Sequence, residues 1–233
     1  MQLALGVSLH DEATLDNFFI GSNHEVVFAL RELIAAKGEP ILYLWGPAGA
    51  GVSHLLQAAC HKVFNAKGNA IYINLSEQQF TPDGLEDLES VDLICLDNID
   101  SVMGDLQWEE ALMHLYNRIR DSGVRLLFGA KALPRALPCQ LLDLKSRLSW
   151  GLVLKLEELS FMALQEALQM RAVKRGLDLS TATCAYLCRY YKDDKTAVFN
   201  VLDQLDKASL LEKRKLTIPF VRKILNETNP EAY

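Results

Sequence analysis

The sequence has no excess of positive charge, few cysteines and no long apolar run. Lysine and arginine number 24 against 30 aspartates and glutamates, so the formal net charge is −6. This balance argues against a protein that grips DNA over a broad basic surface. No apolar stretch approaches the roughly 18 residues of a membrane span. The first residues lack the basic segment of a signal peptide. These absences lead us to expect a cytoplasmic protein that does not associate with membranes.

The cysteines are five, an odd number, and they are scattered along the chain. Cys184 and Cys188 lie four residues apart in a helical pattern, but no second pair of Cys or His follows at zinc-binding spacing. We therefore expect structural or simply buried roles for all five thiols.

Half of the 233 residues are hydrophobic, which is enough for a sizeable core. Five short apolar runs predict strands, and helical periodicity separates most of them. Because each run is almost continuously apolar, we expect an α/β fold with a five-stranded parallel sheet flanked by helices. The predicted strands are residues 41–45, 70–75, 91–96, 124–130 and 152–156. The helices among them are 22–36, capped by Ser22 or Asn23, then 53–65 and 108–122.

After residue 159 the strand signals stop and only helical patterns remain. We expect helices over 160–175, 180–191 and 195–211 and a short last one from Thr217, whose first turn tolerates Pro219. The predicted domains are therefore a flexible tail at 1–10, an α/β nucleotide-binding domain at 11–158 and a small all-helical lid domain at 159–233.

A glycine-rich turn follows the first predicted strand and opens a helix. This order is typical of a P-loop, in which backbone N–H groups cradle phosphates at a helix N-terminus. Gly46 and Gly51 occupy the two glycine positions, and Ser53 occupies the position of a magnesium ligand. Val52 stands where a P-loop carries its lysine. The residues predicted to line the nucleotide here are Gly46, Pro47, Ala48, Gly49, Ala50, Gly51, Val52, Ser53 and His54.

Asp97 ends the third predicted strand, at the edge where open α/β sheets bind ligands. With Ser53 it could hold Mg²⁺ through water if a metal is bound. The following position would need a second carboxylate to activate a water, and Asn98 cannot accept a proton.

A P-loop, a strand that ends in Asp and a helical lid together resemble an AAA+ module. LDNFFIGSN at 15–23 resembles the adenine-side segment of the bacterial replication initiator DnaA, which implies that Phe18 and Ile20 contact the nucleotide. DLKSRLSW at 143–150 resembles that family's arginine-finger segment, which implies a finger role in trans for Arg147. The lid segment 202–225, with LDQLDKASL and KRKLTIPFVRKIL, resembles the Hda family of DnaA regulators.

The first residues resemble the sliding-clamp-binding peptide of the same family. In such a peptide Gln2 would supply hydrogen bonds, and Leu3 and Leu5 would enter an apolar pocket. Gly6 stands where a proline is usual, so the peptide is less pre-organised.

Several groups that stabilise the γ-phosphate in the family are missing. Val52 replaces the lysine, Asn98 replaces the second acid, and the fourth strand ends in Gly129-Ala130-Lys131 without the usual polar sensor. In the lid, Gln204 stands at the sensor-arginine position, with Lys195 as the alternative phosphate contact. We therefore expect a module that binds ADP or ATP but is a poor ATPase by itself. Trp45, Trp108 and Trp150 are expected to serve in packing and not as stacking platforms for bases.

The resemblance implies a regulator of chromosome replication initiation. Such a protein would dock on the sliding clamp and use Arg147 to stimulate ATP hydrolysis by DnaA, which prevents re-initiation. The family's initiator carries a C-terminal DNA-binding domain for which this sequence shows no segment, so we expect no sequence-specific DNA binding. Two alternatives stay open: a self-contained AAA+ ATPase or helicase-loader-like factor acting on DNA, and a scaffold that recruits DnaA without a finger. A homodimer or larger assembly is also compatible with the sequence.

Overall fold

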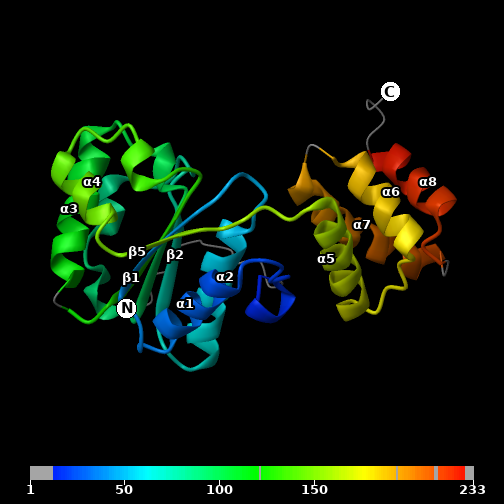
Figure 1. The fold of residues 1–233 in the computed structure, drawn as a ribbon, viewed down its shortest axis with the longest axis horizontal. Coiled ribbons are helices and arrows are strands. Elements are labelled where there is room, and N and C mark those ends of the chain that lie inside the picture. The colour runs from blue at the N-terminus through cyan, green and yellow to red at the C-terminus, as the bar shows by residue number, and fades with distance from the viewer. Residues whose placement is uncertain (1–12, 121, 193, 213–214, 229–233) are drawn as a thin grey trace. The chain divides into compact units, whose positions relative to one another are not determined.

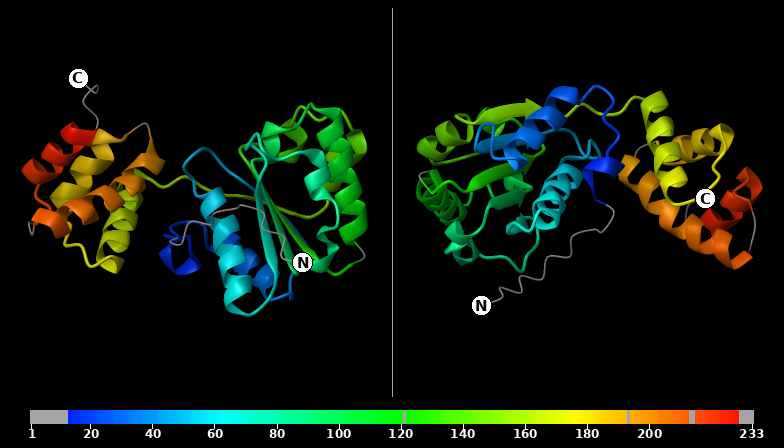
Figure 2. Two further views of the ribbon diagram at one scale, coloured as in Figure 1. Left: turned by 180° about the vertical axis from the view of Figure 1, so that it is seen from behind. Right: turned by 90° about the horizontal axis from the view of Figure 1, so that it is seen from below.

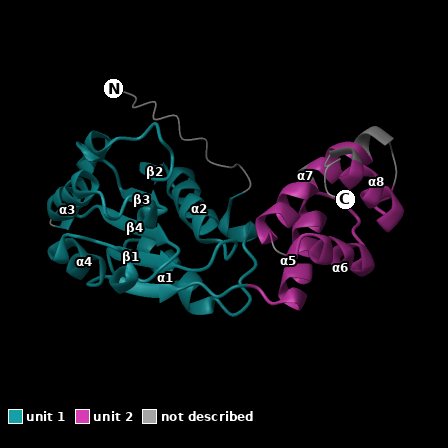
Figure 3. Ribbon diagram, turned by 90° about the horizontal axis from the view of Figure 1, so that it is seen from above, with its two compact units in different colours: residues 1–158 teal, residues 159–233 magenta. Residues whose placement is uncertain are grey.

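The computed structural model describes residues 13–120, 122–192, 194–212 and 215–228. The chain divides into two compact units, Met1–Glu158 and Leu159–Tyr233, which Figure 3 shows in different colours. The first unit contains a five-stranded parallel sheet with the order β2-β3-β4-β1-β5, which confirms the predicted fold class. Its strands are β1 (Ile41–Trp45), β2 (Ala70–Asn74), β3 (Leu93–Asp97), β4 (Arg125–Ala130) and β5 (Leu152–Lys155).

Both faces of this sheet are covered by helices, which is why its strands are apolar on both sides. Helices α1 (His24–Ile34) and α2 (Val52–Asn65) cover one face, and α3 (Leu106–Arg120) and α4 (Leu142–Leu148) cover the other (Figures 1 and 2). Successive strand residues alternate between the two cores. Tyr43 packs on the α3 side, whereas Leu42 and Leu44 pack on the α2 side.

Short 3₁₀ helices occupy several connections that the sequence did not define. They are η1 (Leu15–Asn17), η2 (Pro82–Leu85), η3 (Leu88–Ser90), η4 (Ile99–Ser101) and η5 (Pro134–Ala136). Segments of three or four residues are too short to show a hydrophobic period, so only the structure reveals them.

Backbone hydrogen bonds hold the end of β1 on both sides. The N–H of Gly46 donates to the carbonyl of Ala130 (3.1 Å), the last residue of β4, and the N–H of Leu156 donates to the carbonyl of Trp45 (2.7 Å). The chain therefore leaves the sheet at Gly46 in a fixed direction, and the glycine-rich turn begins there.

Asn23 has a different role from the helix cap predicted from sequence. It precedes α1, but its side chain makes no capping hydrogen bond. Instead its Nδ2 donates to the carbonyl of Glu157 (3.1 Å), and its Oδ1 accepts from the N–H of Glu157 (2.8 Å). The side chain is buried, and it thereby fixes the chain just after β5 to the start of α1.

The described residues of the second unit form a bundle of four helices, as the sequence predicted. They are α5 (Phe161–Lys174), α6 (Thr181–Tyr190), α7 (Lys195–Glu212) and α8 (Ile218–Thr228). Ser160 and Ser180 cap α5 and α6 by accepting the N–H groups of Ala163 and Thr183, each at 3.2 Å. All four helices contribute apolar side chains to one core of their own.

Replacing Asn23 by alanine removes both hydrogen bonds to Glu157 and leaves the N–H and carbonyl of that residue without these partners. We expect the free energy of unfolding to fall by about 2 kcal/mol. Urea unfolding measures it, with Asn117→Ala as the control, because Asn117 is exposed on α3. Equal stability of the two variants would contradict a structural role for Asn23.

Candidate functional site

The turn between β1 and α2, residues 46–53, is called the phosphate loop below. Pro47, Ala48, Gly49 and Ser53 are exposed, whereas Gly46 and Ala50 are buried and hold the loop against the sheet. Among the described residues, no acceptor pairs with the backbone N–H groups of Ala48, Gly49, Gly51, Val52 and Ser53. A run of unpaired N–H groups at a helix start is the arrangement that binds phosphate oxygens.

Gly51 is required by both backbone conformation and space. It precedes α2 with φ of +102°, a left-handed conformation that disfavours other residues. A Cβ at this position would lie 2.9 Å from Cε2 of Phe18. The Phe18 ring therefore lies directly against the phosphate loop.

The segment before α1 packs on the first turn of α2. The ring of Phe18 lies 5.7 Å from that of His54, and His54 Nε2 is 2.9 Å from the carbonyl oxygen of Thr14. Ile20 is half-buried against the same apolar cluster. Phe18 and Ile20, predicted from the DnaA resemblance to contact the nucleotide, thus lie on the α2 side of the sheet with the loop.

Val52 contributes its side chain to the core and leaves no cation on the loop. It is 9% exposed and packs with the cluster between α2 and the sheet. A Cβ on Gly129 would lie 3.0 Å from Cγ1 of Val52 and 2.6 Å from Oδ1 of Asp97. Val52, which replaces the P-loop lysine, and Asp97 at the end of β3 therefore both lie against Gly129 of β4. The space between them admits only glycine at position 129.

Asp97 is 2% exposed and already engaged by the protein. Its Oδ2 accepts the hydroxyl of Tyr72 (2.7 Å), and its Oδ1 accepts the N–H of Asn98 (2.9 Å). Burial, and secondly the charge of Asp97, raise the pKa of Tyr72, so this hydroxyl remains a donor. The Asn98 side chain donates to Oδ1 of Asn74 (2.9 Å) and so joins the ends of β2 and β3.

Ser53 and Asp97 are the residues that could hold Mg²⁺ beside the phosphate loop. The Ser53 hydroxyl is exposed at the start of α2 and suits a metal ligand. Asp97 retains free lone pairs that could order a metal-bound water, but its burial and partners do not favour direct coordination. Among the described residues, no group of three or more His, Cys, Asp or Glu is arranged to hold a metal by itself.

The remaining predicted contacts belong to the second unit or lie outside the described residues. Gln204 is exposed on α7 of the second unit, and the Nζ of its alternative, Lys195, donates to the carbonyl of Leu159 (2.9 Å) within that unit. The predicted clamp-binding residues Gln2, Leu3 and Leu5 lie outside the described residues.

Arg147 lies in the last turn of α4, on the face of the sheet opposite the phosphate loop's helix. Its guanidinium carbon is 5.5 Å from the ring centre of Tyr116 and 5.9 Å from that of Trp150. Among the described residues, no carboxylate forms a salt bridge with it, so it is not the surface ion pair that an arginine at a helix end usually makes. Trp150, expected to serve in packing, is 67% exposed.

Glu109 anchors the other end of α4, which sequence reasoning missed. This α3 side chain is fully buried and accepts the N–H groups of Gly104 (2.8 Å), Gln140 (2.9 Å) and Leu141 (2.8 Å). Burial by itself raises the pKa of Glu109, but the N–H groups outweigh it and the net pKa is lowered. The sequence does contain a signal for this buried carboxylate. Glu109 stands three residues before Leu112 and therefore falls on the apolar face of the predicted helix.

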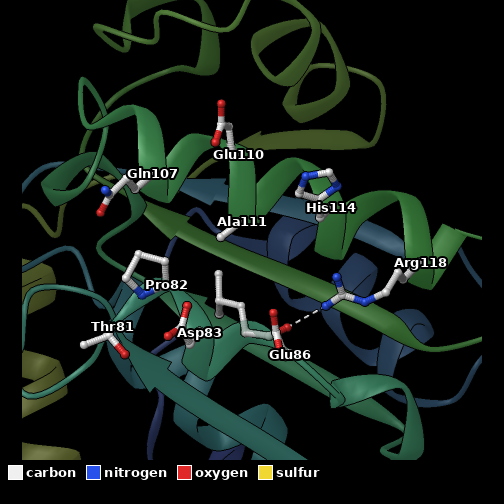
Figure 4. Close-up of a pocket in the computed structure, with 10 residues that line it drawn as sticks. Thr81, Pro82, Asp83, Glu86, Gln107, Glu110, Ala111, His114 and Arg118 are labelled. Atoms are coloured by element: carbon white, nitrogen blue, oxygen red, sulfur yellow. Dashed lines mark hydrogen bonds between the residues drawn. The ribbon is translucent and has the colours of Figure 1, made fainter.

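A cavity of about 560 Å³ lies between η2 and α3 (Figure 4). Arg118 is held at its edge by Glu89 and by the carbonyl of Leu85 (2.7 Å from Nη2). The cavity shares no residue with the phosphate loop. Its lining residues are Thr81, Pro82, Asp83, Leu85, Glu86, Gln107, Glu110, Ala111, His114 and Arg118.

Comparisons with known proteins agree with this geometry. The family model of the bacterial DnaA ATPase domain matches residues 9–155, and that of the Hda lid domain matches residues 162–225. This chain belongs to the DnaA-related AAA+ family, as an Hda-like member. An uncharacterised protein of Haemophilus influenzae is 42% identical over 227 residues, which span 97% of this chain and 98% of that protein.

Solved structures share the fold of this Hda-like chain at low identity. Domain III of the replication initiation protein DnaA from Thermotoga maritima has a TM-score of 0.78 at 19% identity and covers 95% of this chain and 98% of that one. AMPPCP-bound DnaA from Aquifex aeolicus has a TM-score of 0.72 at 19% identity. The match covers 97% of this chain and 70% of that one. In the described part of this Hda-like chain, no helix is long and apolar enough to cross a membrane.

Substituting Gly51 by alanine should strain the left-handed backbone and press a Cβ onto Phe18. We expect a loss of about 2–3 kcal/mol in the free energy of unfolding. Gly123→Ala is the control, because Gly123 has a φ of +81° but open space around it, and it should lose only about 1 kcal/mol. Equal losses by urea unfolding would show that the Phe18 contact does not constrain the loop.

The Glu109→Gln variant should lose about 2 kcal/mol of stability at pH 7, because an amide cannot accept three backbone N–H groups without opposing one with its own donors. The folded-state pKa lies below the ordinary value of 4.5, so the ionised group stabilises the fold above that pH and this contribution is lost as the pH falls.

The difference between the variant and the natural protein should therefore shrink in acid. Urea unfolding at pH 7 and about pH 3.5 checks this, with Glu110→Gln as an exposed neighbouring control. A pH-independent difference would contradict ionisation of Glu109 as the source of its effect.

Proposed function

We propose that this DnaA-related replication regulator binds an adenine nucleotide, ADP or ATP, and stimulates ATP hydrolysis by DnaA through Arg147 acting in trans. The observation that carries the proposal is the guanidinium of Arg147, which no described carboxylate neutralises. An arginine finger stabilises charge on a transferring phosphoryl group and contributes about 10³–10⁵ in rate. Such a finger needs its N–H donors free for phosphate oxygens.

Features of the phosphate loop support binding without efficient hydrolysis. Its unpaired N–H groups suit phosphate oxygens, and a solved DnaA carries the ATP analogue AMPPCP. Val52 and Gly129 place apolar atoms where AAA+ ATPases place polar groups toward the γ-phosphate, and Asn98 cannot act as a base. Ser53, with Asp97 through water, would hold Mg²⁺ if the bound nucleotide carries it.

The N-terminal segment extends the proposal to a partner. Gln2, Leu3 and Leu5 would dock on the DNA polymerase sliding clamp, which would bring Arg147 to DnaA on replicated DNA. Hydrolysis of DnaA-bound ATP would then suppress re-initiation in the cytoplasm.

Replacing Arg147 by alanine should reduce stimulated ATP hydrolysis by DnaA toward the rate of DnaA alone, a loss on the order of 10³-fold. Single-turnover hydrolysis at saturating concentrations of this chain measures it. Arg147→Lys should restore only part of the rate, because lysine lacks the planar fork.

The matched control is Arg135→Ala, which removes the same charge from an exposed position on η5. It should keep the stimulation of the natural chain. Full stimulation by Arg147→Ala would instead exclude the finger role and favour the scaffold alternative.

A further inference from the structure

Two aromatic rings from different parts of the chain hold Arg147. Tyr116 comes from α3 and is 3% exposed, so its position is fixed by the core. Trp150 follows α4, and its backbone N–H donates to the backbone carbonyl of Arg147 (3.0 Å). Tyr116 and Trp150, called the aromatic pair below, thus present one buried ring and one exposed ring to the same guanidinium.

The aromatic pair holds the cation differently from a carboxylate. A carboxylate would accept two guanidinium N–H groups and so occupy the donors that bind phosphate. An aromatic ring attracts the cation through its quadrupole and leaves those donors unpaired. The charge of Arg147 also acts on Tyr116: burial raises the pKa of Tyr116, and Arg147 partly offsets the rise.

One guanidinium nitrogen is both buried and unsatisfied. Nη1 of Arg147 is shielded from solvent and has no hydrogen-bond acceptor among the described residues. A buried N–H of a charged group without an acceptor is costly, and such groups in a folded protein call for a specific role.

We propose that the aromatic pair positions the Arg147 guanidinium for phosphate and that Trp150 is a positioning residue of the stimulated reaction. This inference rests on the proposed finger role of Arg147. Trp150 acts through its ring on Arg147. It should therefore affect the rate of ATP hydrolysis within the complex of this chain with DnaA more than the affinity of the two proteins for each other. Its exposure means that it can be replaced without disturbing the core.

The test compares Trp150→Leu with Trp150→Phe in single-turnover hydrolysis by DnaA. Leucine keeps an apolar side chain without a ring, and phenylalanine keeps a ring. We expect Trp150→Leu to lower the saturating rate about 2- to 10-fold, with an unchanged half-saturating concentration, and Trp150→Phe to recover most of the rate. Phe28→Leu, an exposed aromatic at 65% on α1, is the matched control.

A second measurement needs no DnaA. In the ¹⁵N-arginine-labelled chain, ring currents should displace the Nε–H signal of Arg147, which is assigned by its absence in Arg147→Lys. The displacement should diminish in Trp150→Leu and persist in Phe28→Leu. An undisplaced signal in the natural chain would overturn the aromatic pair, whatever the role of Arg147.

The outcomes separate this inference from the finger itself. If Arg147→Ala abolishes stimulation but Trp150→Leu equals the natural chain, the finger stands and the positioning role is wrong. A change only in the half-saturating concentration would make Trp150 a docking contact and would also overturn positioning. If Arg147→Ala stimulates fully, the finger role fails, and the positioning of a catalytic group fails with it.

Discussion

The hydrogen bonds at the end of β1 determine most of what surrounds the phosphate loop. The N–H of Gly46 donates to the carbonyl of Ala130 at the end of β4, and the N–H of Leu156, just after β5, donates to the carbonyl of Trp45, so β1 is held from both sides where it ends. The chain must then turn before α2 begins, and within the described part of the chain no acceptor pairs with the N–H groups of Ala48, Gly49, Gly51, Val52 and Ser53. Because parallel strands end at a common edge, the same pairing brings the ends of β3 and β4 to this loop.

We propose that the groups at that edge bind a nucleotide and do not hydrolyse it efficiently. The carboxylate of Asp97 is held by Tyr72 and by the backbone of Asn98, and Gly129 leaves just enough space for it beside Val52. The loop has unpaired N–H donors of the kind that suit phosphate oxygens, and Val52 and Gly129 supply no polar side chain beside it. On the opposite face of the sheet, Arg147 retains a positive charge that no described carboxylate neutralises. The two features fit a protein that binds one nucleotide and acts on another.

Sequence reasoning succeeded where the signal is local. The strands follow from continuous apolar runs, and residues 41–45 were predicted to the residue. Val52 and Arg147 could be singled out because short motifs surround them. The groups that set their environment could not be found in this way, since hydrogen bonds and ring contacts join residues distant in the chain. Asn23 meets Glu157 across 134 positions, and Tyr116 and Arg147 come from separate helices.

The central claim is that hydrolysis takes place on the partner's nucleotide and not on this chain's own. The most direct measurement loads radiolabelled ATP on DnaA and unlabelled nucleotide on this chain, mixes them with the sliding clamp, and then repeats the mixing with the label reversed. We expect labelled ADP within a single turnover when the label starts on DnaA, and persistent labelled ATP when it starts on this chain. Conversion only of the label carried by this chain would contradict the claim.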